Sequence, residues 1–264
     1  VLGARGAAIA TVMARFVECI IIVSYTHKHK KKYIFIEDAY SSMKVSGILI
    51  KHIIIKGTPL MCNELLWAAG MSIMTQCYSL RGLAVVASIN IANTISNLFS
   101  VVYISMGSAV SIIIGQLLGA DKMEEAKDTD RKLIFFSVAS CVVIAIFMMI
   151  LAPAFPAIYN TTDEVKALAA KFIIVLALSM PLLAFTNAAY FTLRSGGKTI
   201  VTFLFDSVFV WLCSIPMAFV LSRYTSIDIV WVYFICQMLE FIKCIIGFVL
   251  VRSGVWIENI VVEK

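Results

Sequence analysis

Apolar runs long enough to cross a bilayer follow one another along almost the whole chain, with short polar or charged stretches between them. The hydrocarbon core of a membrane is about 30 Å thick, so about 20 residues at a rise of about 1.5 Å each will span it. We therefore predict seven membrane-spanning helices, at residues 7–25, 58–80, 83–118, 133–159, 167–193, 200–221 and 230–251.

The composition agrees with an all-α, polytopic membrane protein. Hydrophobic residues make up 61% of the 264 positions, and charged residues only 14%. Soluble domains carry about 25% charged residues, so a soluble fold is excluded. The seven cysteines lie in apolar stretches without a CxxC pair, which predicts neither a disulfide framework nor a zinc site.

Basic residues gather on one side of the predicted spans. About 15 of the 22 lysines and arginines fall in residues 28–56, 122–132, 194–198 and the C-terminal tail, against about five on the other side. Because loops rich in Lys and Arg stay in the cytoplasm, we expect a plasma (inner) membrane protein with a cytoplasmic C-terminus. The net charge of +6 is then explained by the basic residues of the cytoplasmic segments, and no nucleic-acid partner is expected.

Two charged connections are expected to lie outside the membrane. Residues 33–56 alternate apolar and charged side chains, as an amphipathic segment on the inner surface would. Residues 119–132 carry charges of both signs and are predicted to form a cytoplasmic loop.

The second predicted span carries an acid at membrane depth. Glu64 follows Pro59, which has no N–H to donate and is expected to bend the helix there. A carboxylate costs about 3 kcal/mol at that depth, so it must face protein or water. This pattern favours an ion or substrate site over a structural ion pair with a neighbouring helix.

A polar stripe follows the third predicted span. Its Asn, Ser and Gly residues recur at steps of three, four or their sums, which places them on one helical face. Asn90, Asn93 and Asn97 favour a water-filled cavity near the outer end, whereas residues 108–115 favour close helix packing. Both interpretations of the stripe stay open.

Three further polar residues are candidates for the same site. Asn187 and Tyr190 lie three residues apart beyond Pro181, so they share a helical face. A proline kink can open a cavity there, although ordinary helix packing explains the pair equally well. Asp206, two turns into the next span, is a weaker candidate than Glu64, because it lies nearer the cytoplasmic end.

The remaining charges and motifs suggest no enzyme. Arg15 with Glu18, and Glu240 with Lys243, are each three apart and are expected to neutralise each other. The chain has no HExxH or GxSxG pattern, and RSGGKT at 194–199 lacks the spacing of a phosphate-binding loop.

Several stretches resemble the multidrug and toxic compound extrusion (MATE) family of bacterial transporters. Together with Pro59 and Glu64 they cover nearly the whole chain in the expected order: GAAIATVMARFVE at 6–18, GQLLGADKMEEAK at 115–127, LRSGGKT at 193–199, and WVY with LEFIK within 231–243. The first of these resembles the sixth helix of the family.

The resemblance implies two six-helix lobes around a central cavity. Residues 1–32 would hold the last helix of the N-terminal lobe and the start of the linker, and residues 33–264 the C-terminal six-helix lobe. The start at Val1, without a Met or a signal peptide, also leads us to expect a piece of a longer protein. Family members exchange organic cations or drugs for Na⁺ or H⁺, and Glu64 resembles an acid of the seventh helix that binds cation or substrate in some of them. Many members also use an acid of the first helix, which would lie in the missing lobe.

The sequence thus predicts the C-terminal part of a Na⁺- or H⁺-coupled antiporter for small organic cations or drugs, with the lipid bilayer and the missing N-terminal lobe as partners and no cofactor beyond the coupling ion. One alternative is a lipid-linked sugar flippase, which would need a basic cavity although these spans hold almost no unpaired Lys or Arg. Another is a seven-helix module that moves nothing, which would leave two isolated acids unexplained. The candidate cation- or substrate-binding residues are Glu64, Asn90, Asn93, Asn187, Tyr190 and Asp206.

The predicted topology can be tested by labelling. Cysteines introduced as Lys30→Cys and Lys127→Cys in a cysteine-free background should react with a membrane-impermeant thiol reagent only after the membrane is opened, because both positions are expected in the cytoplasm. Labelling of either position in intact cells would reverse the orientation.

Overall fold

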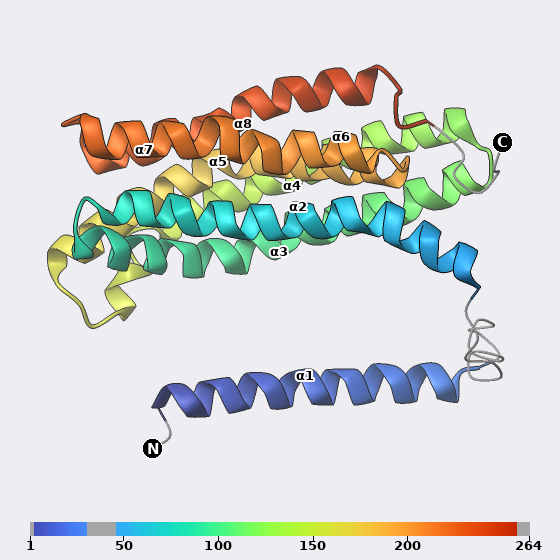
Figure 1. The fold of residues 1–264 in the computed structure, drawn as a ribbon. Coiled ribbons are helices and arrows are strands. Elements are labelled where there is room, and N and C mark those ends of the chain that lie inside the picture. Colours follow the sequence, from blue (N-terminus) through green and yellow to red (C-terminus); the bar gives the residue numbers. More distant parts are fainter. Residues whose placement is uncertain (1–2, 31–45, 258–264) are drawn as a thin grey trace. The chain divides into compact units, whose positions relative to one another are not determined.

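The computed structural model describes residues 3–30 and 46–257. The chain divides into two compact units, Val1–Ile54 and Ile55–Lys264, which we describe separately. The helices of Figure 1 are α1 (Gly3–Lys28), α2 (Gly47–Ser79), α3 (Leu83–Gly119), α4 (Met123–Leu151), α5 (Asp163–Ser195), α6 (Thr199–Phe203), α7 (Ile215–Tyr224) and α8 (Ile229–Arg252).

The prediction of an all-α, polytopic membrane protein is confirmed. Within the described residues, five helices are long and apolar enough to cross a membrane: Leu83–Gly119, Met123–Leu151, Asp163–Ser195, Thr199–Tyr224 and Ile229–Arg252. The other two predicted spans are also helical. Residues 7–25 lie in α1, and the span predicted at 58–80 lies in α2 except for its last residue. The assignment of residues 1–32 and 33–264 to two lobes stays a prediction.

The first unit contains α1 and the beginning of α2. On α1 the predicted pair of Arg15 and Glu18 is present, with Nη1 and Oε2 2.7 Å apart. Most of the predicted amphipathic segment, residues 33–45, lies outside the described residues. From Gly47 onward the segment is the first part of α2, which continues as a helix through Pro59.

The predicted loop at 119–132 is wrong, because α4 begins at Met123. Its first turn carries Glu124 and Glu125, and acids there favour a helix N-terminus electrostatically. Ion pairs at helical spacing follow, with 2.6 Å between Lys127 and Glu124 and 2.5 Å between Lys132 and Asp128. The mixed charges that suggested a loop therefore lie on the first turns of a helix.

Prolines end α4 earlier than predicted. The helix stops at Leu151 instead of residue 159, and a short 3-10 turn at Pro156–Ile158 leads to α5. The side chain of Thr162 caps α5 by accepting a hydrogen bond from the Val165 backbone N–H at 3.4 Å.

The segment from Thr199 to Tyr224 is one continuous helix with a widened middle. Two π-helical stretches, Leu204–Val208 and Val210–Ser214, separate α6 from α7. Pro216 follows at the start of α7, and because it has no backbone N–H it cannot complete the regular α-helical pattern. Such π-bulges often occur at functional sites.

The basic segments of the second unit share one end of the helix bundle. Figure 1 places the turns at 119–123, 195–199 and 253–257 together, and an apolar cluster that includes Leu118, Leu193 and Trp256 joins them. The turns at 79–83, 152–162 and 225–228 lie at the opposite end. This arrangement agrees with the predicted distribution of basic residues between the two sides.

Small residues allow the helices to pack closely, as they do inside membranes. Gly107 directly precedes the packing face predicted at 108–115, and an added Cβ there would lie 2.3 Å from Oδ1 of Asn187. Ser111 does contact α5, since its hydroxyl lies 3.4 Å from that of Ser195. An added Cβ at Gly115 would meet no described atom within 4 Å.

Arg81 joins the turn between α2 and α3 to the end of α7. Its guanidinium donates hydrogen bonds to the backbone carbonyls of Ser222 (2.8 Å), Leu221 (3.0 Å) and Thr225. The last carbonyls of a helix have no partner within that helix, so these hydrogen bonds satisfy them.

We therefore predict that Arg81→Gln lowers the free energy of unfolding by about 2–3 kcal/mol, as expected for hydrogen bonds that involve a charged donor. The measurement is thermal unfolding in detergent micelles. Arg223→Gln is the matched control, because that guanidinium lies over the Phe219 ring. Equal loss of stability in both variants would contradict this role of Arg81.

Candidate functional site

A buried amide connects three helical segments in the interior of the second unit. Asn63 on α2 is 2% exposed, and its Nδ2 donates to Asp206 Oδ2 (3.3 Å) and to Tyr190 Oη on α5 (3.4 Å). The hydroxyl of Ser207 donates to Asn63 Oδ1 at 2.7 Å and to its backbone carbonyl at 2.8 Å. Both polar ends of the Asn63 side chain are thus satisfied.

The π-helical stretch explains how Asp206 and Ser207 reach the same side chain. Consecutive residues of a regular α-helix do not share a face. The widened turn at Leu204–Val208 changes this spacing, so both residues contact Asn63. The local geometry therefore places a carboxylate against α2.

Lys243 on α8 lies between two acids. Its Nζ is 3.1 Å from Asp206 Oδ1 and 3.5 Å from Glu240 Oε1, and its side chain is only 8% exposed. The predicted pairing of Glu240 with Lys243 is confirmed, whereas the description of Asp206 as an isolated acid is wrong. The sequence could not show this ion pair, because its partners are 37 residues apart.

The charges of this network do not cancel. With one ammonium and two carboxylates, it carries a net charge of −1 when all three groups are ionised. The rings of Phe205 and Phe209 lie 5.5 and 6.0 Å from Lys243 Nζ and add favourable cation–π contacts. An excess negative charge among apolar helices favours the arrival of a proton or another cation.

One acceptor in the network has no partner. Oε2 of Glu240 is buried and makes no hydrogen bond with any residue in the described part of the chain. A buried carboxylate oxygen without a hydrogen bond is costly, so such groups are rare in proteins. A proton or a cation bound at this oxygen would satisfy it.

Glu64 lies beside the network without belonging to it. It is the neighbour of Asn63 on α2, but its side chain is exposed on the surface of this unit. It is close enough to Tyr190 to interact with it electrostatically, as is Arg194. Tyr190 is therefore the residue that connects the buried network with Glu64.

The six predicted site residues do not converge on one place. Tyr190 and Asp206 belong to the network, whereas Asn187 packs against Gly107 of α3. Asn187 Oδ1 is buried and has no hydrogen-bond partner among the described residues. Asn93 is half-buried and Asn90 is exposed.

The two asparagines of α3 also lie at another depth. Gly107 contacts Asn187 while the Ser88 hydroxyl donates to the Val165 carbonyl, so α3 and α5 run parallel and residues near Ser88 lie far from Asn187. Asn93 precedes Gly107 by 14 residues, which is about 21 Å along a helix at about 1.5 Å per residue. The structure thus separates Asn90 and Asn93 from the network around Asp206.

Sequence reasoning missed Asn63, Ser207 and Lys243 as members of the site. The sequence did contain a signal, since Lys243 lies within an apolar span, but its spacing from Glu240 already accounted for its charge. A further buried acid, Asp130, accepts a hydrogen bond from the Thr192 hydroxyl at 2.6 Å and is 1% exposed. Asp130 was not a candidate because it lies within the loop predicted at 119–132.

The arrangement suits the binding of a proton or of a cation with few protein ligands. In the part of the chain that the structure describes, no three His, Cys, Asp or Glu side chains converge as a metal site. The network instead offers two carboxylates around one ammonium, with Tyr190 bound to the same asparagine, Asn63.

Two curated relatives are multidrug resistance proteins by name. The chain is 24% identical over 233 residues to the probable multidrug resistance protein YoeA of Bacillus subtilis, covering 88% of this chain and 50% of YoeA. It is 27% identical over 236 residues to the probable multidrug resistance protein NorM of Mannheimia succiniciproducens, covering 84% and 48%. The chain spans about half the length of these curated relatives.

Solved structures have the same fold. An outward-facing multidrug resistance MATE family transporter of the MOP superfamily matches with a TM-score of 0.73 at 17% identity, over 82% of this chain and 48% of that one. A crystal structure of MATE in complex with MaL6 matches with a TM-score of 0.71 at 17% identity, over 80% and 48%. The MatE family model matches residues 59–220, more than half of the sequence. This chain belongs to the MatE family.

Proposed function

We propose that this chain forms the C-terminal six-helix lobe of a multidrug efflux antiporter that exchanges organic cations for Na⁺ or H⁺. The observation that carries the proposal is the intramembrane network of Asp206, Lys243 and Glu240, which keeps one unpaired negative charge. Ionisable residues within membrane spans are expensive, and they mark ion or substrate pathways. The names of the curated relatives support drugs as the exported compounds.

The substrate cation binds between Glu64 and the ring of Tyr190. Glu64 is exposed on α2, and its neighbour Asn63 donates a hydrogen bond to the Tyr190 hydroxyl at 3.4 Å, so a cation beside Glu64 would lie near an aromatic residue as well as a carboxylate. The exposed surface around Glu64 forms one wall of the cavity, and a second lobe completes it. Asn187 can border the same cavity, whereas Asn90 and Asn93 contact it only nearer the other membrane face.

The coupling ion and the substrate compete through charge. In a medium of low dielectric constant, burial favours the protonated form of a carboxyl group, and an adjacent cation favours the ionised form. A coupling ion bound at Glu64 or at Oε2 of Glu240 lowers the negative charge that attracts the drug. Linkage then requires that drug binding release a proton and that low pH weaken drug binding.

A lipid-linked sugar flippase is less well supported. Such a protein needs basic groups inside its transport cavity that are available to a phosphate, but Lys243, which lies in the middle of α8, is already held by two acids. A seven-helix module without transport gives no reason for the MatE match over residues 59–220.

The experiment that tests the proposal is a titration of drug affinity against pH, with ethidium as the organic cation. In the transporter of which this chain forms the C-terminal half, Glu64→Gln should weaken ethidium binding by roughly 5–150-fold at neutral pH, the usual range of coupling between sites. It should also remove most of the dependence of affinity on pH, because the glutamine cannot ionise.

The matched control for that titration is Glu164→Gln, which removes an exposed acid from the first turn of α5. It should leave both affinity and pH dependence unchanged. If Glu64→Gln binds ethidium with the affinity and pH slope of the wild type, Glu64 is a structural acid and the proposed substrate site is wrong.

A second prediction concerns the stability of the network. Lys243→Met leaves Asp206 and Glu240 as buried acids without their cation, and breaking a buried ion pair in this way costs about 3–5 kcal/mol. Adding Asp206→Asn should restore part of the lost stability, because one of the two uncompensated charges is then removed.

The readout for Lys243→Met is thermal unfolding of the purified protein in detergent, compared with wild type, Asp206→Asn and the double variant. Coupling between the two substitutions distinguishes an ion pair from independent packing effects. Strictly additive losses in the double variant would show that Asp206 and Lys243 do not depend on each other.

A further inference from the structure

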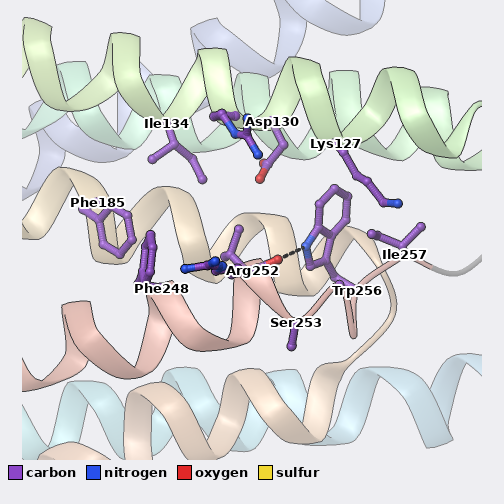
Figure 2. A pocket seen from close by; sticks show the side chains of 12 residues that line it. Lys127, Asp130, Ile134, Phe185, Phe248, Arg252, Ser253, Trp256 and Ile257 are labelled. Carbon is purple, nitrogen blue, oxygen red and sulfur yellow. Dashed lines mark hydrogen bonds between the residues drawn. The ribbon is translucent and has the colours of Figure 1, made fainter.

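A second polar cavity lies away from the network, at the end of the bundle where α4 begins and α8 ends. Figure 2 shows it between α4, α5, α8 and the turn that follows α8. Its volume is about 800 Å³, which lies in the range of cavities that hold a drug-sized or larger molecule. All of its lining residues belong to the second unit of the chain.

Two arginines give this cavity a positive charge that no acid among the described residues pairs with. Arg131 on α4 and Arg252 at the end of α8 line the cavity and are exposed. Neither guanidinium forms an ion pair with another described residue. Lys127 also lines the cavity, but its Nζ lies 2.6 Å from Glu124 Oε1 and is partly neutralised.

One acid lies in the wall of the cavity. The carboxylate of Asp130 is buried and already accepts a hydrogen bond from the Thr192 hydroxyl at 2.6 Å. With Asp130 counted as ionised and Lys127 as neutralised by Glu124, the two arginines still leave the described lining residues with a net charge of +1. The cavity therefore favours an anionic occupant.

The part of the cavity nearer the membrane interior is apolar. Figure 2 shows Phe185 and Phe248 next to each other on this side, with Ile134 opposite them and Arg252 between them and Trp256. Phe248 is 53% exposed, so this apolar surface continues onto the outer face of the bundle. An occupant can thus place a charged group among the arginines and a hydrocarbon chain along the phenylalanines.

The remaining wall is formed by the turn that follows α8. The chain turns back after α8 at Gly254, which has a φ of +71°. Trp256 is 2% exposed, and its indole N–H donates to the Val251 carbonyl at 2.9 Å. An added Cβ at Gly196 would lie 2.0 Å from the Trp256 carbonyl oxygen, so this turn packs directly on the end of α5.

We propose that this cavity binds the phosphate headgroup of an anionic phospholipid. Arg131 and Arg252 contact the phosphate, and an acyl chain lies along Phe248 toward the membrane interior. Guanidinium groups suit phosphate because their N–H donors match its oxygens in pairs. Basic pockets between membrane helices are known to bind anionic headgroups. Free phosphate would leave the apolar side of so large a cavity empty, so the lipid is the better match.

The test titrates phosphatidylglycerol into the purified chain in a mild detergent and counts bound lipids by native mass spectrometry. Arg131→Gln with Arg252→Gln should weaken phosphatidylglycerol binding about 30-fold, the effect expected for two basic residues at a membrane surface. Wild type should prefer phosphatidylglycerol to phosphatidylcholine by a factor of similar size. Both arginines are exposed, so the double variant should fold normally.

The matched control removes two basic charges elsewhere, with Lys132→Gln and Arg223→Gln. Lys132 follows Arg131 directly but pairs with Asp128, and Arg223 lies at the end of α7. The control should keep the affinity of wild type, and millimolar glycerol phosphate should not displace the lipid. Equal losses in the two double variants, equal binding of the two lipids, or displacement by glycerol phosphate would each overturn the proposal.

Discussion

The cost of placing an ammonium group inside the bilayer governs the arrangement of the second unit. Lys243 can remain there only with acids beside it, and one of them, Asp206, comes from a different helical segment. That requirement fixes α8 against the helix that runs from Thr199 to Tyr224. The π-helical turn then allows the neighbouring Ser207 to bind Asn63, so α2 is held in the same place. One buried cation thus connects three segments that apolar packing alone would leave free to slide.

Hydropathy predicts the helices well because the bilayer requires long apolar segments with all backbone hydrogen bonds satisfied. Hydropathy predicts the ends of the helices less well. α4 starts ten residues before its predicted position at 133, because charged side chains can form ion pairs along a helix as readily as in a loop. The sequence shows the prolines at the other end of α4, but it does not show which of them ends the helix.

The candidate site was harder to predict than the fold, for a reason that Asn63 and Glu64 illustrate. Both are polar residues of one span, and the sequence draws attention to the charged one. Which of two adjacent residues faces the interior depends on the rotation of α2, which is set by partners 127 and 144 residues away. Asp206 shows the same limit, since its pairing with Lys243 depends on a contact that no local spacing reveals. Residues three or four apart, such as Glu240 and Lys243, are the case that sequence can predict.

Under the proposed function, the two kinds of acid in the second unit suit different steps of an exchange. An acid held by a buried ammonium, as Asp206 is, releases its partner only at a high energetic cost, so it is a poor place for a substrate that must leave again. Glu64 is exposed and has no such partner among the described residues, so a cation can reach it and depart. Glu240 lies between these cases, because one of its oxygens is bound to Lys243 and the other has no hydrogen-bond partner in the described residues. Under the proposed function, a proton on that second oxygen changes the charge of the network without dismantling it. A small ion can then alter the affinity of Glu64 for a drug while the helices stay packed.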